Sequence, residues 1–383
     1  MKSEWKECTI ADLGEVVGGA TPSTKKSENY ENGTISWITP KDLSKFHDRY
    51  IYHGERNITK IGLKSCSAKM LPKNTILFSS RAPIGYLAIA GTELCTNQGF
   101  KSVIPNANTD FLFLYYLLKF HKQNIEHMGS GTTFKEVSGN TMKSIKVSVP
   151  VDISEQHKIA IILSAIDDKI ELNNKINQNL EQQAQAIFKS WFINYKPNGI
   201  LSDIANITMG QSPKGTSYNN EGIGTIFFQG KTDFGNRFPT VRVYTTEPKK
   251  VAQSGDILIS VRAPVGDLNI TNQKCCIGRG LASIRSKNNN QSFLFYTLLN
   301  IKSQLDIFNS QGTVFGAINQ KSLKDLSIII PPYKIVEKFE KVVSPIDEMI
   351  KINEVENQKL SALRDLLLSK LINGEIDVSK IKI

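Results

Sequence analysis

The 383-residue sequence contains no run of about 18 or more apolar residues, so it predicts no membrane-spanning helix. Cysteine is scarce: there are five, none in a CxxC pair, and Cys275 and Cys276 are adjacent. This odd, unpatterned set argues against a disulfide framework and favours a reduced, cytoplasmic protein. Hydrophobic residues make up 40% and charged residues 22%, a globular composition, and the length favours two domains over one.

Catalytic and cofactor-binding motifs are also missing. There is no GxxxxGK(S/T) loop, no glycine-rich loop between a strand and a helix, and no GxSxG elbow. The five histidines show no metal-ligand spacing with the cysteines. The IPPY segment at Ile330–Tyr333 resembles the NPPY of adenine methyltransferases, but Ile330 replaces the asparagine that would hold the target amino group. The sequence therefore predicts no active site, no metal and no cofactor on this chain.

What the sequence does have is an excess of positive charge, formally +11 at pH 7. Residues 1–151 carry a net +6 and residues 197–332 another +6, whereas residues 152–196 carry −1 and residues 333–383 are neutral. A basic isoelectric point can reflect an AT-rich bacterial genome. Two equal and separate basic parts favour instead two modules that bind a polyanion.

The sequence is also an internal duplication. The matches at a spacing of 181 residues are RAPIG (81–85) with RAPVG (262–266), GTTF (131–134) with GTVF (312–315), and Tyr115 with Tyr296. The matches at a spacing of 191 residues are GATPS (19–23) with GQSPK (210–214) and TISW (34–37) with TIFF (225–228). The change in spacing predicts a longer loop in the first copy, between residues 43 and 76.

Each copy is a mixed region followed by a long helix. Short β-branched runs, Gly and Asn turns and one short helix predict the mixed part. The fold class is therefore α+β: two duplicated mixed α/β domains separated by two long antiparallel helices, related by a pseudo-twofold. We expect the boundaries at residues 1–151, 152–197, 198–332 and 333–383.

Both long helices carry a heptad pattern, from Ile159 to Trp191 and, 180 residues later, from Phe339 to Leu371. The pattern predicts a coiled coil. We expect an antiparallel pair, because a compact domain follows the first helix and must return the chain; two helices that dock separately are the alternative. The expected interface consists of Ile166, Ile170, Asn173, Asn177, Leu180, Ile346, Ile350, Asn353, Asn357 and Leu360.

A pair of asparagines lies at the midpoint of each heptad seam. A polar residue on a seam costs stability but selects register, because it demands a hydrogen-bonding partner opposite. Antiparallel pairing brings the four asparagines into one central layer, in which each amide satisfies another.

Polar and basic side chains gather in the turns that follow the predicted strands. Recognition loops need donors that reach phosphates and base edges, and glycines that allow close approach. Arg81 and Arg262 each follow a strand and can fork onto phosphate or guanine, or else pair with a neighbouring carboxylate. The candidate DNA-contacting residues are Thr21, Ser23, Lys25, Lys41, Arg81, Asn97, Gln98, Thr132, Thr133, Lys135, Ser212, Lys214, Lys231, Arg262, Arg279 and Thr313.

Three details of this set carry alternatives. Asn97 and Gln98 occupy the place that Arg279 occupies in the second copy, a difference expected of two modules that read different sequences. Lys41 and Lys231 are either contacts to DNA or ordinary solvated lysines. The amides and hydroxyls of GTTF and GTVF either hold a phosphate or form a structural turn around a buried Phe.

The whole chain resembles the specificity subunit of Type I restriction–modification systems. The segments that carry the resemblance are GGATPS and MGQSPK, TISWITPKDL, SSRAPIG and SVRAPVG, GSGTTF and SQGTVF, FKSWFIN (188–194) and LLSKLINGEI (367–376). The resemblance implies two target recognition domains, each reading half of a bipartite, asymmetric site in double-stranded DNA. It also implies a non-catalytic subunit whose helices act as spacer and dock the methyltransferase subunits, two in number, with restriction subunits as further partners. S-adenosylmethionine, ATP and Mg²⁺ are then expected on those partners.

The helix seam limits the spacing of the two half-sites. From Ile159 to Trp191 it spans about 48 Å at ~1.5 Å per residue, which corresponds to about 14 base pairs of DNA. Two other functions fit the sequence: the specificity part of a fused restriction–methylation polypeptide, and a regulatory DNA binder such as a single-chain repressor.

Overall fold

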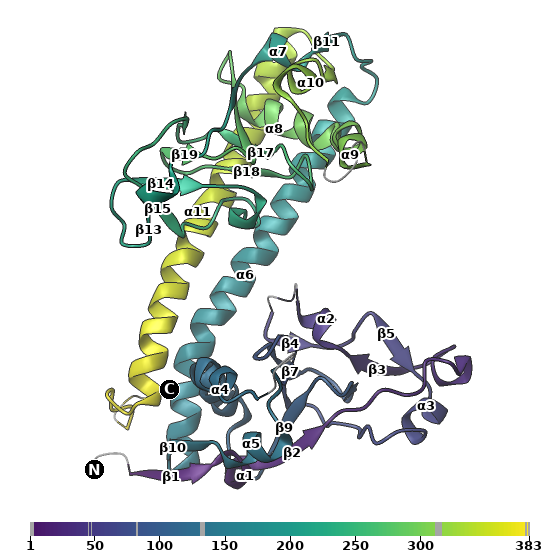
Figure 1. Ribbon diagram of the computed structural model, residues 1–383, viewed down its shortest axis with the longest axis vertical. Helices are drawn as coiled ribbons and strands as arrows, with labels where there is room; N and C mark the ends of the chain where they lie inside the picture. The colour runs from purple at the N-terminus through teal and green to yellow at the C-terminus, as the bar shows by residue number, and fades with distance from the viewer. Residues whose placement is uncertain are drawn as a thin grey trace. The chain divides into compact units, whose positions relative to one another are not determined.

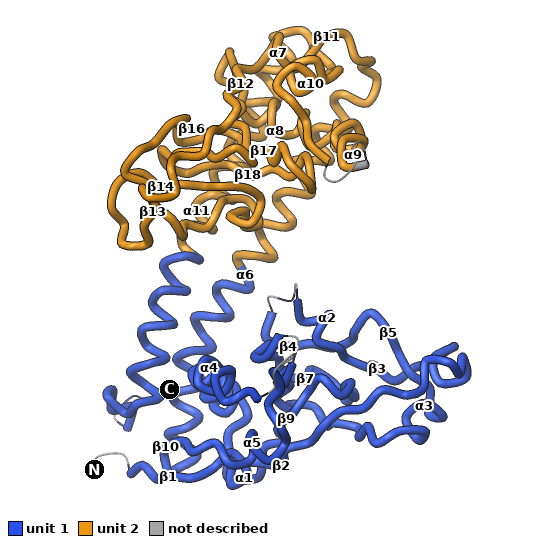
Figure 2. Tube along the Cα trace, viewed as in Figure 1, with its two compact units in different colours: residues 1–172, 357–383 blue, residues 173–356 orange. Residues whose placement is uncertain are grey.

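The computed structural model describes residues 4–44, 46, 48–81, 83–130, 135–310, 316–379 and 381 (Figure 1). The chain forms two compact units: unit 1 is residues 1–172 with 357–383, and unit 2 is residues 173–356 (Figure 2). The long helices α6 (Ile153–Phe192) and α11 (Tyr333–Ile372) each contribute residues to both units. Within the described part of the chain, no helix combines the length and apolarity needed to cross a membrane.

Unit 1 is built from three sheets. Its five-stranded sheet has the order β2 (Gly14–Gly18), β9 (Lys101–Pro105), β6 (Ile76–Phe78), β7 (Leu87–Ala90), β4 (Tyr50–Ile51). The other two consist of β5 (Arg56–Ile58), β3 (Ile35–Ile38) and β8 (Cys95–Thr96), and of β1 (Trp5–Thr9) with β10 (Lys146–Pro150). Strand pairs are antiparallel except β3–β8 and β4–β7.

Unit 2 repeats this plan. Its four-stranded sheet has the order β12 (Ala205–Met209), β20 (Leu281–Ser286), β17 (Ile257–Ser260), β18 (Leu268–Ile270), which matches β2-β9-β6-β7. The other sheets are β13 (Tyr218–Asn219), β15 (Val243–Thr245), β14 (Thr225–Phe228), β19 (Cys275–Ile277), β16 (Val251–Ala252), and the pair β11 (Gly199–Ile200) and β21 (Ser327–Ile328). The parallel pair β14–β19 matches β3–β8.

Each unit packs a helix between its strands and the long helices. In unit 1 this is α4 (Phe111–His127), whose first turn is capped by Asp110 accepting from the Phe113 amide at 2.8 Å. In unit 2 it is α8 (Gln291–Asn300), followed by α9 (Lys302–Ser310). The remaining short helices are α1 (Ile10–Leu13), η1 (Ser27–Asn29), α2 (Pro40–Leu43), α3 (Lys60–Lys64), α5 (Gly139–Ser144), α7 (Leu201–Ile204), η2 (Gly215–Ser217), η3 (Lys231–Asp233) and α10 (Gln320–Lys324).

The two long helices run antiparallel within unit 2. Asn173 Nδ2 donates to Glu356 at 2.8 Å, and Asn353 Nδ2 donates to Asn177 Oδ1 at 2.7 Å. Further along, the Phe188 and Phe339 rings meet edge to face with centroids 5.6 Å apart. The residue numbers of the contacting positions therefore decrease along α11 as they increase along α6, which is the order that antiparallel pairing requires.

The heptad pattern predicts the wrong buried residues at the end of α6. Phe188 and Phe192 are each 3% exposed, whereas Trp191, a predicted seam residue, is 36% exposed and meets Phe339 edge to face. Phe188 and Phe192 both pack on Phe293 of α8. The buried stripe shifts here because this end of the helix contributes to the core of its domain as well as to the partner helix.

Candidate nucleic-acid interface

Three of the predicted residues of unit 2 meet around one surface pocket of about 460 Å³. Lys231, Arg262 and Arg279 line it, together with Gln229 and Thr232. These three residues lie in different segments of the chain, and the fold brings them together at one place.

The pocket forms where strands β14, β17 and β19 end. Asp233 accepts from the Gln229 amide at 2.7 Å, which holds the turn that carries Lys231. The Gly278 amide donates to Phe228 O at 2.8 Å and the Val261 amide to Gly280 O at 2.9 Å. These backbone bonds fix Lys231, Arg262 and Arg279 as neighbours without using their side chains.

Unit 1 has the same backbone hydrogen bonds between the ends of its strands. We call this arrangement the backbone crossing. The Asn97 amide donates to Ile38 O at 2.9 Å, and the Ser80 amide donates to Gly99 O at 2.7 Å. Asn97, Ser80 and Gly99 match Gly278, Val261 and Gly280 at the spacing of 181 residues, whereas Ile38 matches Phe228 at 190, one residue less than the spacing of TISW and TIFF. Lys41, Arg81 and Gln98 therefore occupy the places of Lys231, Arg262 and Arg279.

The glycine-rich turns predicted to contact DNA lie against this crossing. Thr21 Oγ1 donates to Gln98 Oε1 in unit 1, and in unit 2 the Arg279 amide donates to Ser212 Oγ at 3.2 Å. Ser23, Lys25 and Lys214 are exposed on the same turns, and Lys135 is exposed elsewhere in unit 1. Thr132, Thr133 and Thr313 lie outside the described residues.

The charged residues of the two units are held differently. Arg81 Nη1 lies 3.6 Å from Glu136, which also pairs with Lys101 at 3.3 Å, so the alternative of a carboxylate-held arginine holds in unit 1. Arg81 and Glu136 form an isolated β-bridge, and the matching bridge in unit 2 joins Arg262 to Ala317. Arg262 and Arg279 are exposed, and neither forms an ion pair with any residue that the structure describes.

The lysines are only loosely constrained. Lys41 lies 2.7 Å from Glu55, and both side chains are mostly exposed, so this pair contributes little stability. Lys231 pairs with Asp267, which Lys302 also contacts at 3.1 Å. Burial opposes ionisation of Asp267, but its hydrogen bonds from the two lysines hold its pKa below the usual value.

Asn97 has a structural function in its turn. Its Oδ1 accepts from the Gly99 amide at 2.9 Å, which ties the Asn97 side chain to the backbone of its own turn. Gln98, the next residue, is exposed. We therefore retain Gln98 as the counterpart of Arg279 and regard Asn97 as part of the framework.

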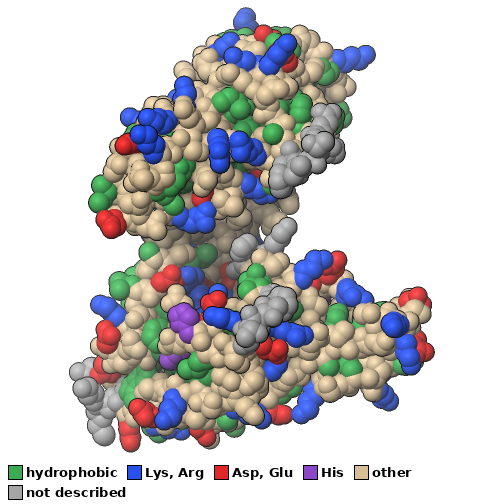
Figure 3. Space-filling model, in the orientation of Figure 1, with side chains coloured by type: hydrophobic (Ala, Val, Ile, Leu, Met, Phe, Trp, Pro, Cys, Tyr) green, Lys and Arg blue, Asp and Glu red, His purple; other side chains and the backbone are tan. Residues whose placement is uncertain are grey.

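One face of unit 2 is rich in basic side chains. On the face shown in Figure 3, unit 2 carries several groups of Lys and Arg side chains with few acidic side chains between them. A polyanion such as DNA is attracted to such a surface, and the attraction weakens as salt rises.

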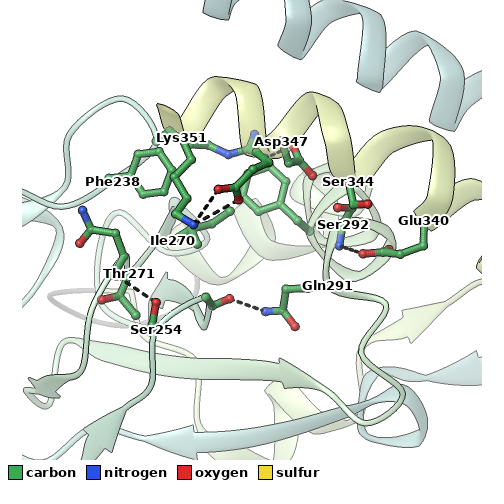
Figure 4. A pocket seen from close by; sticks show the side chains of 15 residues that line it. Phe238, Ser254, Ile270, Thr271, Gln291, Ser292, Glu340, Ser344, Asp347 and Lys351 are labelled. Atoms are coloured by element: carbon green, nitrogen blue, oxygen red, sulfur yellow. Dashed lines mark hydrogen bonds and ion pairs between the residues drawn. The ribbon is translucent and has the colours of Figure 1, made fainter. Parts of the chain in front are cut away.

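The sequence analysis missed the polar contacts that fasten each mixed domain to the long helices. In unit 2, Arg237 pairs with Asp347 of α11, beside a pocket of about 210 Å³ lined by residues of α8 and α11 (Figure 4). In unit 1, Arg49 pairs with Asp168 and Glu171 of α6. Neither arginine stands in a segment that repeats, which is why comparison of the two copies did not find them.

A tyrosine–aspartate pair accompanies each arginine. Tyr116 OH donates to Asp167 at 2.7 Å, and Tyr296 OH donates to Asp347 at 2.8 Å. Burial raises the pKa of both phenols, so each stays a hydrogen-bond donor at neutral pH. The sequence comparison matched Tyr115 with Tyr296; by contact, the counterpart of Tyr296 is Tyr116, which follows the 180-residue spacing of the long helices.

The family of the chain follows from its similarity to known proteins. The family model of the Type I restriction modification DNA specificity domain matches twice, over residues 2–182 and 198–362. The chain belongs to this family. The two matches confirm the duplication, and the predicted function of a specificity subunit, rather than a catalytic one, is confirmed with it.

Full-length relatives agree with this assignment. The Type I restriction enzyme MjaIX specificity subunit of Methanocaldococcus jannaschii is 35% identical over 99% of this chain and 95% of its own length. The putative Type I restriction enzyme MjaX specificity subunit of the same organism is also 35% identical, over 98% and 94%. The crystal structure of a Type I system S subunit from M. genitalium has the same fold, with a TM-score of 0.58, 20% identity and 96% of each chain covered.

Proposed function

We propose that this specificity subunit reads a bipartite, asymmetric DNA site, one half with each unit, through the residues at the shared backbone crossing. In unit 2 these are Ser212, Lys231, Arg262 and Arg279. Their counterparts in unit 1 are Thr21, Lys41, Arg81 and Gln98.

One observation carries the proposal. Two independent domains of one chain present polar and basic side chains from the same three strand ends, on a framework held by matching backbone bonds. Residues placed in this way can contact base edges and phosphates together, which sequence reading requires. The net charge of the two mixed regions supports a polyanionic ligand.

In this proposal the chemistry belongs to partner subunits. Two methyltransferase subunits dock on the long helices and methylate adenine, and restriction subunits cleave the DNA. S-adenosylmethionine, ATP and Mg²⁺ bind to those partners. Among the described residues there is no group of three or more His, Cys, Asp or Glu side chains placed to hold a metal ion.

Genome-wide mapping of methylated adenines tests the proposal. The chain is expressed with its methyltransferase subunits in a host that has no other adenine methylation. We expect a split motif with two defined halves and a fixed gap, absent when this chain is left out. A continuous motif, or methylation that does not depend on this chain, contradicts the proposal.

A further inference from the structure

The two units place chemically different side chains at one structural position. Gln98 and Arg279 both follow the residue whose amide is bonded to the end of the neighbouring strand. Both also lie beside a hydroxyl, Thr21 in unit 1 and Ser212 in unit 2. The backbone is therefore matched at this point, and only the side chain presented to a ligand differs.

These side chains recognise different bases. An arginine forks onto O6 and N7 of guanine, whereas a glutamine pairs with N6 and N7 of adenine. The Thr21 hydroxyl orients Gln98 by donating to its Oε1, which keeps a second lone pair for the adenine amino group, while Nε2 can donate to N7. The Arg279 guanidinium is exposed at the rim of the pocket.

Arg81 in unit 1 and Arg262 in unit 2 also differ in their surroundings. In unit 1, Glu136 shares its carboxylate between Arg81 and Lys101 and offsets the charge of Arg81. In unit 2 the corresponding residue is Ala317, which offers Arg262 no carboxylate. The Arg262 guanidinium is therefore available to contact a base, whereas Arg81 must first break its ion pair with Glu136.

We infer that unit 2 specifies guanine through Arg279 and Arg262, and that unit 1 specifies adenine at the matched position through Gln98. This inference rests on the proposed function. It also assigns Glu136 and Ala317 as positioning residues, because they determine whether the arginine of the turn is available to a base.

Reciprocal substitutions test the assignment. Arg279→Gln and Gln98→Arg are made in the full chain and assembled with the methyltransferase subunits. Methylation motifs are mapped, and binding is measured to duplexes that carry each base in turn at every position of the site. Arg285→Gln, on strand β20 where Asp256 holds the arginine, and Gln123→Arg, on the exposed face of α4, are the matched controls. Thermal unfolding shows whether each variant is folded.

We expect each variant to change one position in one half-site. Arg279→Gln lowers affinity for the original guanine about 5- to 150-fold and shifts the preference toward adenine. Gln98→Arg shifts one position of the other half from adenine toward guanine, and the controls leave the motif unchanged. Ala317→Glu weakens a second guanine in the half read by unit 2, because it provides Arg262 with a carboxylate.

Two outcomes overturn the inference and leave the proposed function standing. One is a split motif whose Arg279-sensitive half contains no guanine. The other is an equal loss of affinity on all sequences in both swaps, which means that these side chains contact the backbone of DNA. If the unmodified complex produces no split motif at all, the proposed function itself fails.

Discussion

Arg237 Nη2 lies 2.5 Å from Asp347 Oδ1, and the guanidinium lies over the Phe295 ring at 3.7 Å from its centroid. The arginine is only 4% exposed, and Asp347 also accepts from Tyr296 OH. One buried arginine thus connects the loop before Phe238, helix α8 and helix α11 in unit 2.

Replacing this arginine should destabilise unit 2. Arg237→Met keeps much of the volume but leaves the partly buried Asp347 carboxylate without its cation, and we expect the free energy of unfolding to fall by about 3 kcal/mol. Denaturant unfolding followed by intrinsic tryptophan fluorescence measures the change. The double variant Arg237→Met/Asp347→Leu should recover part of the loss, and a change below about 0.5 kcal/mol in the single variant contradicts the assignment.

The Asp167 carboxylate in unit 1 should make the stability of the protein depend on pH in the acidic range. Burial opposes its ionisation, but Lys119, Arg364 and the Tyr116 hydroxyl hold its pKa below the usual value. A lowered pKa contributes stability that is present above the usual aspartate range and is lost as pH falls through it. Asp167→Asn should therefore cost about 1–3 kcal/mol at pH 7 and show a smaller fall in stability between pH 6 and pH 3 than the original chain. Glu155→Gln, a half-buried carboxylate in the first turn of α6, is the control. Equal pH profiles of Asp167→Asn and the original chain contradict this role of Asp167.

The central asparagines should be coupled energetically. Asn353 donates to Asn177, but carboxylates that the sequence analysis did not include also take part: Glu354 contacts Asn177 at 3.4 Å, and Glu356 accepts from Asn173. Asn177→Leu should lower the free energy of unfolding by about 1–3 kcal/mol, because the Asn353 amide loses its acceptor. A double-mutant cycle with Asn353→Leu measures the coupling; a coupling energy near zero removes this pair from the interface.

The four asparagines that the sequence predicts to form one layer also allow a test of how helix register affects DNA recognition. Asn357, the fourth asparagine, is buried in unit 1. Replacing all four by Leu should blur the spacing between half-sites that the complex accepts, because polar seam residues reject shifted registers. Methylation of duplexes with one base pair added to or removed from the gap measures this. A quadruple variant with the original strict spacing rules out the layer as the register determinant.

The two turn arginines should differ in importance. Arg262→Ala should weaken binding at one half-site by about 1–3 kcal/mol, because its guanidinium has no ion pair among the described residues. Arg81→Ala should have a smaller effect, because Glu136 already occupies its guanidinium. Titration of duplexes altered in one half-site at a time separates the two effects. Equal losses on every sequence in both variants mean that both arginines contact phosphate, and no loss in either means that they only brace their turns.

The chain alone should be inactive on DNA. Purified chain supplied with labelled S-adenosylmethionine and duplex DNA should transfer no methyl group, because the sequence contains no methyltransferase motif and Ile330 replaces the asparagine of NPPY. Adding the methyltransferase subunits should restore transfer. Methylation by chain free of partner subunits contradicts the assignment of chemistry to those partners.

The duplication, the α+β class and the two long helices were predictable because repeated segments and heptads are local patterns along the chain. The identity of Lys231, Arg262 and Arg279 as turn residues was predictable for the same reason. Their convergence around one pocket was not, because it depends on strand pairing across the domain.

Residues that act through long-range contacts escaped the sequence analysis. Arg49 and Arg237 are buried ion-pair partners of the helices, although arginine is normally a surface residue. Glu136 became visible only through its bridge to Arg81. Trp191 followed the heptad pattern, but burial at that end of α6 is decided by the core of the adjoining domain.

Gly19 and Gly210 hold matching turns close to the neighbouring backbone in the two units. A Cβ on Gly19 would lie 2.1 Å from Asn97 O, and one on Gly210 would lie 2.2 Å from Gly278 O, so the turn approaches the neighbouring backbone as closely as the chain allows. This contact fixes the path of the chain beside Gln98 and Arg279 without involving either side chain. If Gln98 and Arg279 read bases as proposed, a substitution at position 98 or 279 changes which sites in a genome the complex protects while the architecture of the domain stays the same.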